Sequence, residues 1–408
     1  MAMLSSSSPT YTEQQPGINL DSIRQDTLGC HDKIYLNSAG ASLMPQPVVQ
    51  IMRDYLNQEE QLGGYAVEQL RTNDIQDLYT ELAQLLRCQP RNIAYTNSST
   101  ESFAKALSAI PFKSNNCIVT TNDDYISNQI AFLALQKRLG LQIWRADNLE
   151  NGDIDLNHFE QLVQQHQPAL VAITHIPTNS GLVQQVEEVG KICRHYGIWY
   201  LLDACQSVGQ MEVYPEEIGC DFLTASGRKF LRGPRNTGFL YVSDRVLQAG
   251  LEPLFIDRRG AEWTTFDGYQ IQDNGKRFEY QEISGSLAGL TEAIRYANKI
   301  GIANIAAYNQ TLRERLRENL SAQQGLELLD KGSRLSNLVT FRLPGVALET
   351  IVNTLKSNQV VYTVSYKNFA LIDFTKKGVD WAIRFSPHYF NTLGEMDNVS
   401  DIVARINR

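Results

Sequence analysis

The sequence predicts an α/β protein with two domains: a large domain on a mostly parallel sheet and a smaller C-terminal α+β domain. Through the first two thirds of the chain, short runs that are apolar on both faces alternate with helical patterns. This alternation is typical of a parallel sheet covered by helices on both sides, and it stops near residue 290. We expect an N-terminal arm over residues 1–30, the large domain over 31–290 and the small domain over 291–408.

Five strands of the large domain are expected from their apolar runs, at residues 117–122, 169–176, 198–205, 220–227 and 237–242. The first run precedes a helical pattern over 127–140, which we expect to pack on one face through Ile130, Leu133, Leu135 and Leu139. A second helical pattern, over 186–197, ends in Gly197, a residue that commonly terminates helices. The connections therefore predict strand–helix–strand units.

Composition narrows the class of protein. The net charge of −8 disfavours a nucleic-acid partner, because phosphate recognition needs concentrated positive charge. None of the six cysteines forms a CxxC pair or has a histidine at zinc-ligand spacing, so we expect no metal site and a reduced, cytoplasmic protein. The first residues lack the pattern of a secretory signal, and no apolar run approaches the roughly 18 residues of a membrane span.

Two chemically complementary side chains follow strands of the predicted sheet. Asp203 ends the run at 198–205, and Lys229 lies in the loop after the run at 220–227. Ligands of parallel α/β sheets bind beyond the carboxyl ends of strands, so both residues can face one crevice. A lysine amine beside a carboxylate suits the trapping of a carbonyl group. The alternatives are a solvated lysine and a helix-capping aspartate with Gln206 at the capping-box spacing.

The wider pattern resembles the pyridoxal-phosphate enzymes of the aminotransferase class V family, which includes cysteine desulfurases, selenocysteine lyases, kynureninase and isopenicillin N epimerase. The resemblance rests on Asp203 and Gln206 as an Asp-x-x-Gln pair, on Ser226-Gly227-Arg228-Lys229, and on the glycines at 233 and 238. It extends from residues 35–45 to 384–392. It implies pyridoxal-phosphate fold type I, pyridoxal 5'-phosphate as cofactor, an amino-acid substrate and a homodimer.

The resemblance also assigns roles around the cofactor ring. Lys229 would bind the cofactor covalently as an internal aldimine and, once displaced, move the Cα proton. Asp203 would pair with the pyridine nitrogen, and Gln206 would donate a hydrogen bond to the ring oxygen. Tyr125 takes the position of the aromatic residue that stacks on the ring.

At the phosphate end, Ser99 and Thr100 stand where a helix is expected to begin, in a sequence that reads Ser-Ser-Thr-Glu where the family usually has Gly-Thr-Thr-Glu. Free backbone N–H groups at a helix start favour an anion, although the same residues could form an ordinary cap. Ser226 and Arg228, which flank Lys229 closely, are further phosphate ligands by resemblance.

Five residues are expected at the substrate by resemblance. Arg384 matches the arginine that binds the substrate carboxylate, which would orient the bonds at Cα. Thr178 or Asn179 occupies the place of a family asparagine, and the register there stays open. Asn37 and Tyr65 are expected to line the pocket. We interpret His175, next to this stretch, as a satisfied core histidine.

Two departures bear on the reaction. Cysteine desulfurases carry a nucleophilic cysteine shortly before the matching arginine, but residues 360–381 hold no cysteine. Persulfide chemistry of that kind is therefore disfavoured. Gln281 and Glu282 stand where desulfurases have a Gly-Thr pair that reaches the partner subunit's phosphate, so that contact is open.

The leading hypothesis is a pyridoxal-phosphate enzyme acting at Cα or Cβ of a free amino acid, namely a C–S lyase that eliminates through an external aldimine. The alternative is an amino-acid epimerase or aminotransferase of the isopenicillin N epimerase-like type. A catalytically silent binding subunit of the same fold is the hypothesis outside enzymes. A dinucleotide-binding protein is disfavoured because no GxGxxG follows a first strand.

Overall fold

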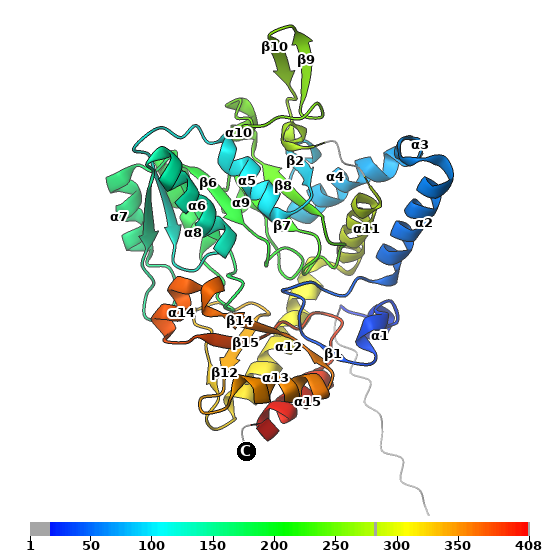
Figure 1. Ribbon diagram of the computed structural model, residues 1–408, viewed down its shortest axis with the longest axis vertical. Helices are drawn as coiled ribbons and strands as arrows, with labels where there is room; N and C mark the ends of the chain where they lie inside the picture. Colours follow the sequence, from blue (N-terminus) through cyan, green and yellow to red (C-terminus); the bar gives the residue numbers. More distant parts are fainter. Residues whose placement is uncertain (1–16, 281–283, 407–408) are drawn as a thin grey trace, which may run out of the picture.

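The computed structural model describes residues 17–280 and 284–406. Its large domain is built on a seven-stranded sheet (Figure 1). The strand order is β2 (Ile93–Thr96), β8 (Gly238–Val242), β7 (Phe222–Ser226), β6 (Trp199–Asp203), β5 (Leu170–Thr174), β3 (Cys117–Thr121) and β4 (Gln142–Ala146). Pairing is parallel from β7 to β4, while β8 runs antiparallel to both of its neighbours. The predicted fold class is confirmed, and each of the five predicted strands is present.

Helices cover both faces of this sheet and bury its strands almost completely, except for the edge strand β4. One core joins the sheet to α4 (Thr72–Leu86), α7 (Leu156–His166), α8 (Val186–Tyr196) and α11 (Gly285–Ile300). The other face packs on α5 (Ser99–Ala109) and α6 (Ile126–Leu139). The expected packing of α6 is wrong in detail. Phe132 is its fully buried apolar residue, whereas Ile130, Leu133 and Leu139 are exposed.

The small domain is a four-stranded antiparallel sheet with helices on it. Its strand order is β11 (Glu327–Leu328), β12 (Val339–Arg342), β15 (Trp381–Phe385) and β14 (Thr363–Tyr366). The longer helices are α12 (Ile302–Ser321), α13 (Leu348–Ser357) and α15 (Leu393–Ile406), and α14 (Leu371–Lys377) is a short helix between β14 and β15. We propose that this unit is the domain expected over 291–408.

The N-terminal segment belongs to the small domain's core and is not a separate arm where the structure describes it. After α1 (Leu20–Gln25), β1 (Ile34–Tyr35) pairs in parallel with β13 (Val360–Val361). Ile23 and Leu36 are buried among side chains of α12 and α15. The expected start of the large domain at residue 31 is therefore too early, because strand pairing and apolar burial tie this segment to the C-terminal part.

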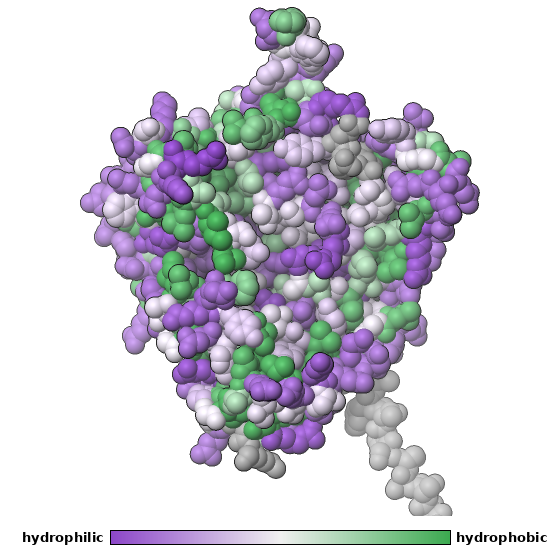
Figure 2. Space-filling view, viewed as in Figure 1, coloured by the Kyte–Doolittle hydropathy of each residue, from purple (hydrophilic) through white to green (hydrophobic). Residues whose placement is uncertain are grey.

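The remaining elements connect these layers. They are α2 (Gln46–Leu62), α3 (Gly64–Leu70), α9 (Pro215–Ile218), α10 (Asp244–Gln248), and the 3₁₀ turns Leu28–Cys30, Pro90–Asn92, Gly275–Phe278 and Lys367–Phe369. A hairpin of β9 (Ala261–Thr265) and β10 (Gly268–Ile271) projects from the large domain. Figure 2 shows it as a narrow projection whose tip has a hydrophobic residue beside hydrophilic ones. None of the described helices combines the length and apolarity that a bilayer crossing requires.

Candidate active site

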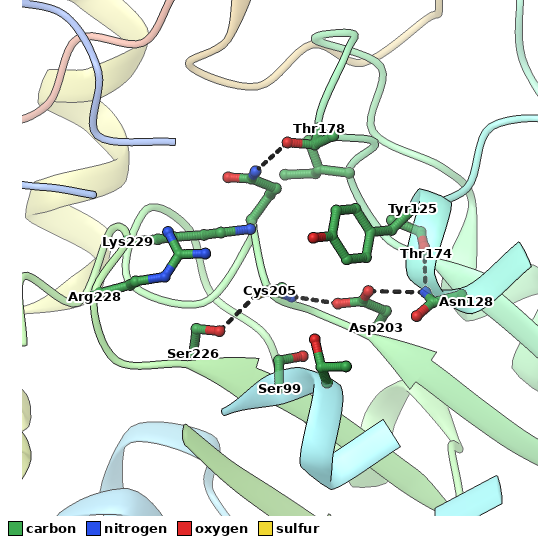
Figure 3. Close-up of a pocket in the computed structure, with 13 residues that line it drawn as sticks. Ser99, Tyr125, Asn128, Thr174, Thr178, Asp203, Cys205, Ser226, Arg228 and Lys229 are labelled. Atoms are coloured by element: carbon green, nitrogen blue, oxygen red, sulfur yellow. Dashed lines mark hydrogen bonds between the residues drawn. The ribbon is translucent and has the colours of Figure 1, made fainter. Parts of the chain in front are cut away.

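A pocket lies where the loops after β3, β5, β6 and β7 meet the start of α5 (Figure 3). Its lining consists of Ser99, Thr100, Tyr125, Asn128, Thr174, Ile176, Thr178, Asp203, Cys205, Gln206, Ser226, Arg228 and Lys229. Every residue predicted to contact the cofactor is in this set. The carboxyl ends of parallel strands converge at one edge of a sheet, which explains how distant parts of the sequence meet here.

Asp203 is a buried carboxylate at the end of β6. Its Oδ1 accepts a hydrogen bond from the backbone N–H of Cys205 at 2.9 Å, and its Oδ2 accepts one from Asn128 Nδ2 at 3.0 Å. Burial raises the pKa of Asp203, while the Asn128 hydrogen bond and the charge of Lys229 act in the opposite direction. No helix begins at Asp203, so the capping alternative is wrong. A cation at this carboxylate would complete its environment.

Lys229 lies on the turn after β7 and points into the same pocket (Figure 3). Its side chain is buried, and its Nζ lies 5.9 Å from the ring centroid of Tyr125. No carboxylate of the described residues forms an ion pair with it. The amine is therefore confined to the pocket and is not occupied by a carboxylate of the described residues, which leaves it available to a carbonyl carbon.

The start of α5 forms an anion-binding end of the pocket. Ser98 is the N-cap: its Oγ accepts from the backbone N–H of Glu101 at 3.1 Å, and Glu101 Oε2 accepts from the N–H of Asn97 at 2.8 Å. The capping task thus falls to Ser98, and the hydroxyls of Ser99 and Thr100 are left at the pocket. Helix N–H groups and these hydroxyls together favour an anion such as a phosphate.

Arg384 is a buried cation on β15 of the small domain. Its Nη1 donates to the backbone oxygen of Thr178 at 2.7 Å and to Thr178 Oγ1 at 3.0 Å, and its Nη2 donates to Asn37 Oδ1 and Thr363 Oγ1, each at 3.2 Å. Its Nε has no partner among the described residues. Burial, and then the charge of Arg228, lower the pKa of Arg384 to about 10. A buried guanidinium without a carboxylate calls for an anionic ligand.

The model of the aminotransferase class V family matches residues 34–399. The chain belongs to this family. A probable cysteine desulfurase of Methanothermobacter thermautotrophicus is 28% identical over 394 residues, with 95% of this chain and 98% of that protein covered. The apo structure of a cysteine desulfurase from Thermococcus onnurineus NA1 is 27% identical, covers 95% of this chain and 97% of that one, and has a TM-score of 0.86.

A third similar structure is a lysine variant of the protein C-DES in which glycine is covalently linked to the pyridoxal-phosphate cofactor. It is 20% identical, covers 93% of this chain and 98% of that one, and has a TM-score of 0.83; at this identity it shows the fold alone. Class V aminotransferase-family enzymes use pyridoxal 5'-phosphate, so the predicted family, fold type, enzyme class and cofactor are confirmed.

The pocket fits this cofactor on its own chemistry. The two carboxylate oxygens of Asp203 accept hydrogen bonds, and Asp203 forms no ion pair with any described residue, so a protonated pyridine nitrogen would find its counter-charge there. The other end of the pocket offers the start of α5 and Arg228 to a phosphate. Gln206 also lines the pocket, but its Nε2 already donates to Thr178 Oγ1 at 2.9 Å and to the backbone oxygen of Ala39 at 3.1 Å. Its buried Oε1 has no partner among the described residues, so the donor predicted for the ring oxygen is occupied in this arrangement. Lys229 would supply the amine for covalent attachment.

The residues predicted at the substrate divide into two groups. Thr178 lines the pocket, and Asn37 contacts Arg384. Asn179 does not line the pocket, because its Nδ2 donates to Asp373 of α14 at 2.7 Å. Tyr65 is also absent from the pocket: it is 80% exposed on α3 and lines a separate hollow. Gln281 and Glu282 lie outside the described residues.

His175 is buried as predicted, but it is not satisfied. Neither ring nitrogen has a hydrogen-bond partner among the described residues. Burial lowers the pKa of His175 to about 3, so the ring is neutral. The histidine serves packing without a polar role that the structure reveals.

Sequence reasoning missed Asn128 and Cys205. Asn128 lies on the first turn of α6, three residues after Tyr125, so the helical period could have brought it to the same edge. Cys205 stands inside the Asp-x-x-Gln motif, and its Sγ lies 3.1 Å from Ser226 Oγ. It is therefore a thiol that lines the pocket.

Proposed function

We propose that the chain is a C–S lyase: it removes a sulfur leaving group from Cβ of a free amino acid. The observation that carries amino-acid recognition is Arg384, a buried guanidinium without an anion, which reaches the cofactor pocket through Thr178. A substrate carboxylate would supply the missing charge.

The side chains divide the work in this proposal. Arg384 binds the carboxylate and thereby orients the bonds at Cα, and Lys229 takes the Cα proton as the nearest amine. The charge of Asp203 keeps the pyridine nitrogen protonated. When bound, the cofactor withdraws electrons from Cα. In sum, a thioether or thiol amino acid and water give pyruvate, ammonia and the free thiol.

Elimination is favoured over transfer of sulfur to a protein thiol by the segment before Arg384. Residues 360–381 form β13, β14, a 3₁₀ turn and α14, and they contain no cysteine. The thiol that does line the pocket, Cys205, adjoins Asp203 and Ser226. It comes from the sheet that carries the cofactor site, not from the small domain.

An amino-acid panel tests the proposal. We expect purified enzyme with cofactor to release pyruvate together with sulfide from cysteine, a thiol from a thioether amino acid with sulfur on Cβ, or cysteine persulfide from cystine. Lys229→Ala should abolish this release. Keto acid formed without loss of ammonia would indicate an aminotransferase, and loss of optical rotation alone an epimerase. Either outcome would overturn the lyase assignment.

We also propose a homodimer in a reducing, cytoplasmic setting. The support for the dimer is a set of exposed apolar residues on the hairpin and the loop before it, namely Leu254, Phe255, Trp263, Phe266 and Tyr269. Exposed apolar groups of this size commonly mark contact surfaces. The support for the setting is that all six cysteines are free thiols.

A further inference from the structure

The loop after β5 is held by two side chains of the small domain at consecutive residues. Arg384 donates to the backbone oxygen and the hydroxyl of Thr178, at 2.7 and 3.0 Å. Asp373 Oδ2 accepts from Asn179 Nδ2 at 2.7 Å. Asp373 and Asn179 are both buried, so this contact is shielded from water and joins the two domains beside the pocket.

The helix that carries Asp373 is fixed to the strand that carries Arg384. Phe374 of α14 is fully buried in a cluster with Ala382, which lies on β15 two residues before Arg384. Lys377, one turn after Asp373, lies 2.9 Å from the same Oδ2 and balances its charge. Arg384 and Asp373 therefore belong to one packed unit that grips the loop at two points.

We propose that Asp373 is a positioning residue for amino-acid binding. It holds Asn179, which keeps the neighbouring Thr178 in place, and Thr178 in turn contacts the Arg384 guanidinium at the pocket. This inference rests on the function proposed above. It assigns a role to the segment that lacks the desulfurase cysteine, since α14 serves there as a clamp on the loop.

The hydrogen bonds of Arg384 explain why the loop needs the second contact, between Asp373 and Asn179. Thr178 occupies Nη1, and Asn37 and Thr363 occupy Nη2, so a carboxylate that binds the guanidinium competes with them. Thr178 Oγ1 also accepts from Gln206 at 2.9 Å. If Arg384 turned to the substrate without Asp373 in place, Thr178 would lose its hold on the small domain.

Removal of Asp373 has a specific cost at Asn179. The Oδ1 of Asn179 already lacks a partner among the described residues. Without Asp373 its Nδ2 would lose the bond as well, and a buried amide with no partner favours a rearranged loop. An asparagine at position 373 keeps an acceptor for Asn179 and loses the charge that faces Lys377.

The test compares Asp373→Ala, Asp373→Asn, Asn179→Ala and the double alanine variant, with Asp380→Ala as control. Asp380 is an exposed carboxylate of the same domain. Amino-acid affinity is read from the change in cofactor absorbance on titration, and KM and kcat from thiol release. We expect Asp373→Ala to raise the dissociation constant and KM about tenfold, the effect of removing one buried hydrogen bond, with kcat and cofactor content near those of the parent.

Asp373→Asn should restore affinity to within about threefold, and the double variant should bind no worse than either single one because both act through one contact. A merely structural role would lower the amount of active enzyme and leave KM unchanged, which overturns the inference. Equal affinity in Asp373→Ala and parent also overturns it; if Asp373→Ala does not fold, Asn179→Ala and Asp373→Asn decide by the same readouts. A parent that neither binds nor turns over any amino acid overturns the proposed function together with it.

Discussion

Three basic residues of one turn, Arg228, Lys229 and Arg232, have three different environments. Lys229 and Arg228 face the pocket. Arg232 is fully buried behind them, donating to the backbone oxygen of Leu43 at 2.8 Å and to Thr27 Oγ1 at 2.5 Å. Its guanidinium also lies 4.8 to 4.9 Å from two aromatic ring centroids in the small domain. Arg232 therefore ties the lysine turn to the N-terminal segment, and only its neighbours are available for chemistry.

The buried carboxyl of Asp123 predicts that the stability of the protein depends on pH. Asp123 is buried at the loop between β3 and α6, faces Asp373, Lys376 and Lys377, and accepts from Asn148 Nδ2 at 2.8 Å. Burial, and then the charge of Asp373, raise its pKa from 3.8 to about 6. Because the folded state binds this proton more tightly than the unfolded state does, the protonated carboxyl favours folding at low pH. This contribution to the free energy of unfolding is lost as the pH rises through about 6.

We therefore expect Asp123→Asn to stabilise the protein above pH 6. Relative to the parent, its free energy of unfolding should gain about 2 kcal/mol more at pH 8 than at pH 4.5, from the size of the pKa shift. Denaturant unfolding at the two pH values measures this, with Asp380→Asn as the exposed control. An identical pH profile in parent and Asp123→Asn would show that the carboxyl is not the titrating group.

At the scale of elements, α5 separates two tasks that adjacent serines perform. Ser98 caps the helix through the N–H of Glu101, and Ser99 Oγ lies at the pocket, where it donates to Thr224 Oγ1 at 3.1 Å. Ser98→Ala should reduce the stability of the cofactor-free protein by about 1 kcal/mol and change cofactor affinity little. On the proposal that the Ser99 hydroxyl binds the cofactor's phosphate, Ser99→Ala should weaken cofactor binding about tenfold.

Titration of the cofactor-free protein, together with its denaturant unfolding, gives both quantities for both variants. Each serine is the control for the other, because they are neighbours of the same type. If Ser98→Ala weakened cofactor binding and Ser99→Ala did not, then Ser98, and not Ser99, would be the serine that binds the phosphate.

An element could be predicted from the sequence where its own residues carry a clear local pattern, and could not be where its position depends on distant residues. The central strands are apolar on both faces and end in the motif residues, so β6 with Asp203 and β7 before Lys229 follow from the sequence. The register at Thr178 and Asn179 does not, because it is set by Asp373 and Arg384 of another domain. The burial of Ile23 likewise depends on a partner segment more than 250 residues away.

The β9–β10 hairpin has a local sequence signal, although it is not among the strands predicted from the apolar runs. Asp267-Gly268 is a dipeptide typical of tight hairpin turns, and aromatic residues flank it at Trp263 and Tyr269. The turn dipeptide does not explain why a projecting hairpin exposes so much apolar surface. An explanation requires contacts beyond the hairpin itself.

At the scale of the whole molecule, the hairpin predicts self-association. Trp263 is 77% and Phe266 is 95% exposed, beside Leu254 and Phe255 of the preceding loop. Covering these apolar side chains with a partner surface removes them from water and is favourable. In the proposed homodimer, that partner surface belongs to a second copy of this chain. Asp267 already stands at the tip, so Phe266→Asp would replace the most exposed aromatic ring by a second carboxylate next to the first. Burying that added charge in the contact costs several kcal/mol.

We therefore expect the Trp263→Ala, Phe266→Asp variant to sediment as a monomer at micromolar concentration, while the parent sediments as a dimer. Gln270→Glu, an exposed position of the same hairpin, adds the same charge away from the aromatic tip and should leave the dimer intact. Sedimentation equilibrium distinguishes these cases directly. A parent that is monomeric, or a double variant that remains a dimer of unchanged stability, would show that the hairpin does not hold two copies of the chain together.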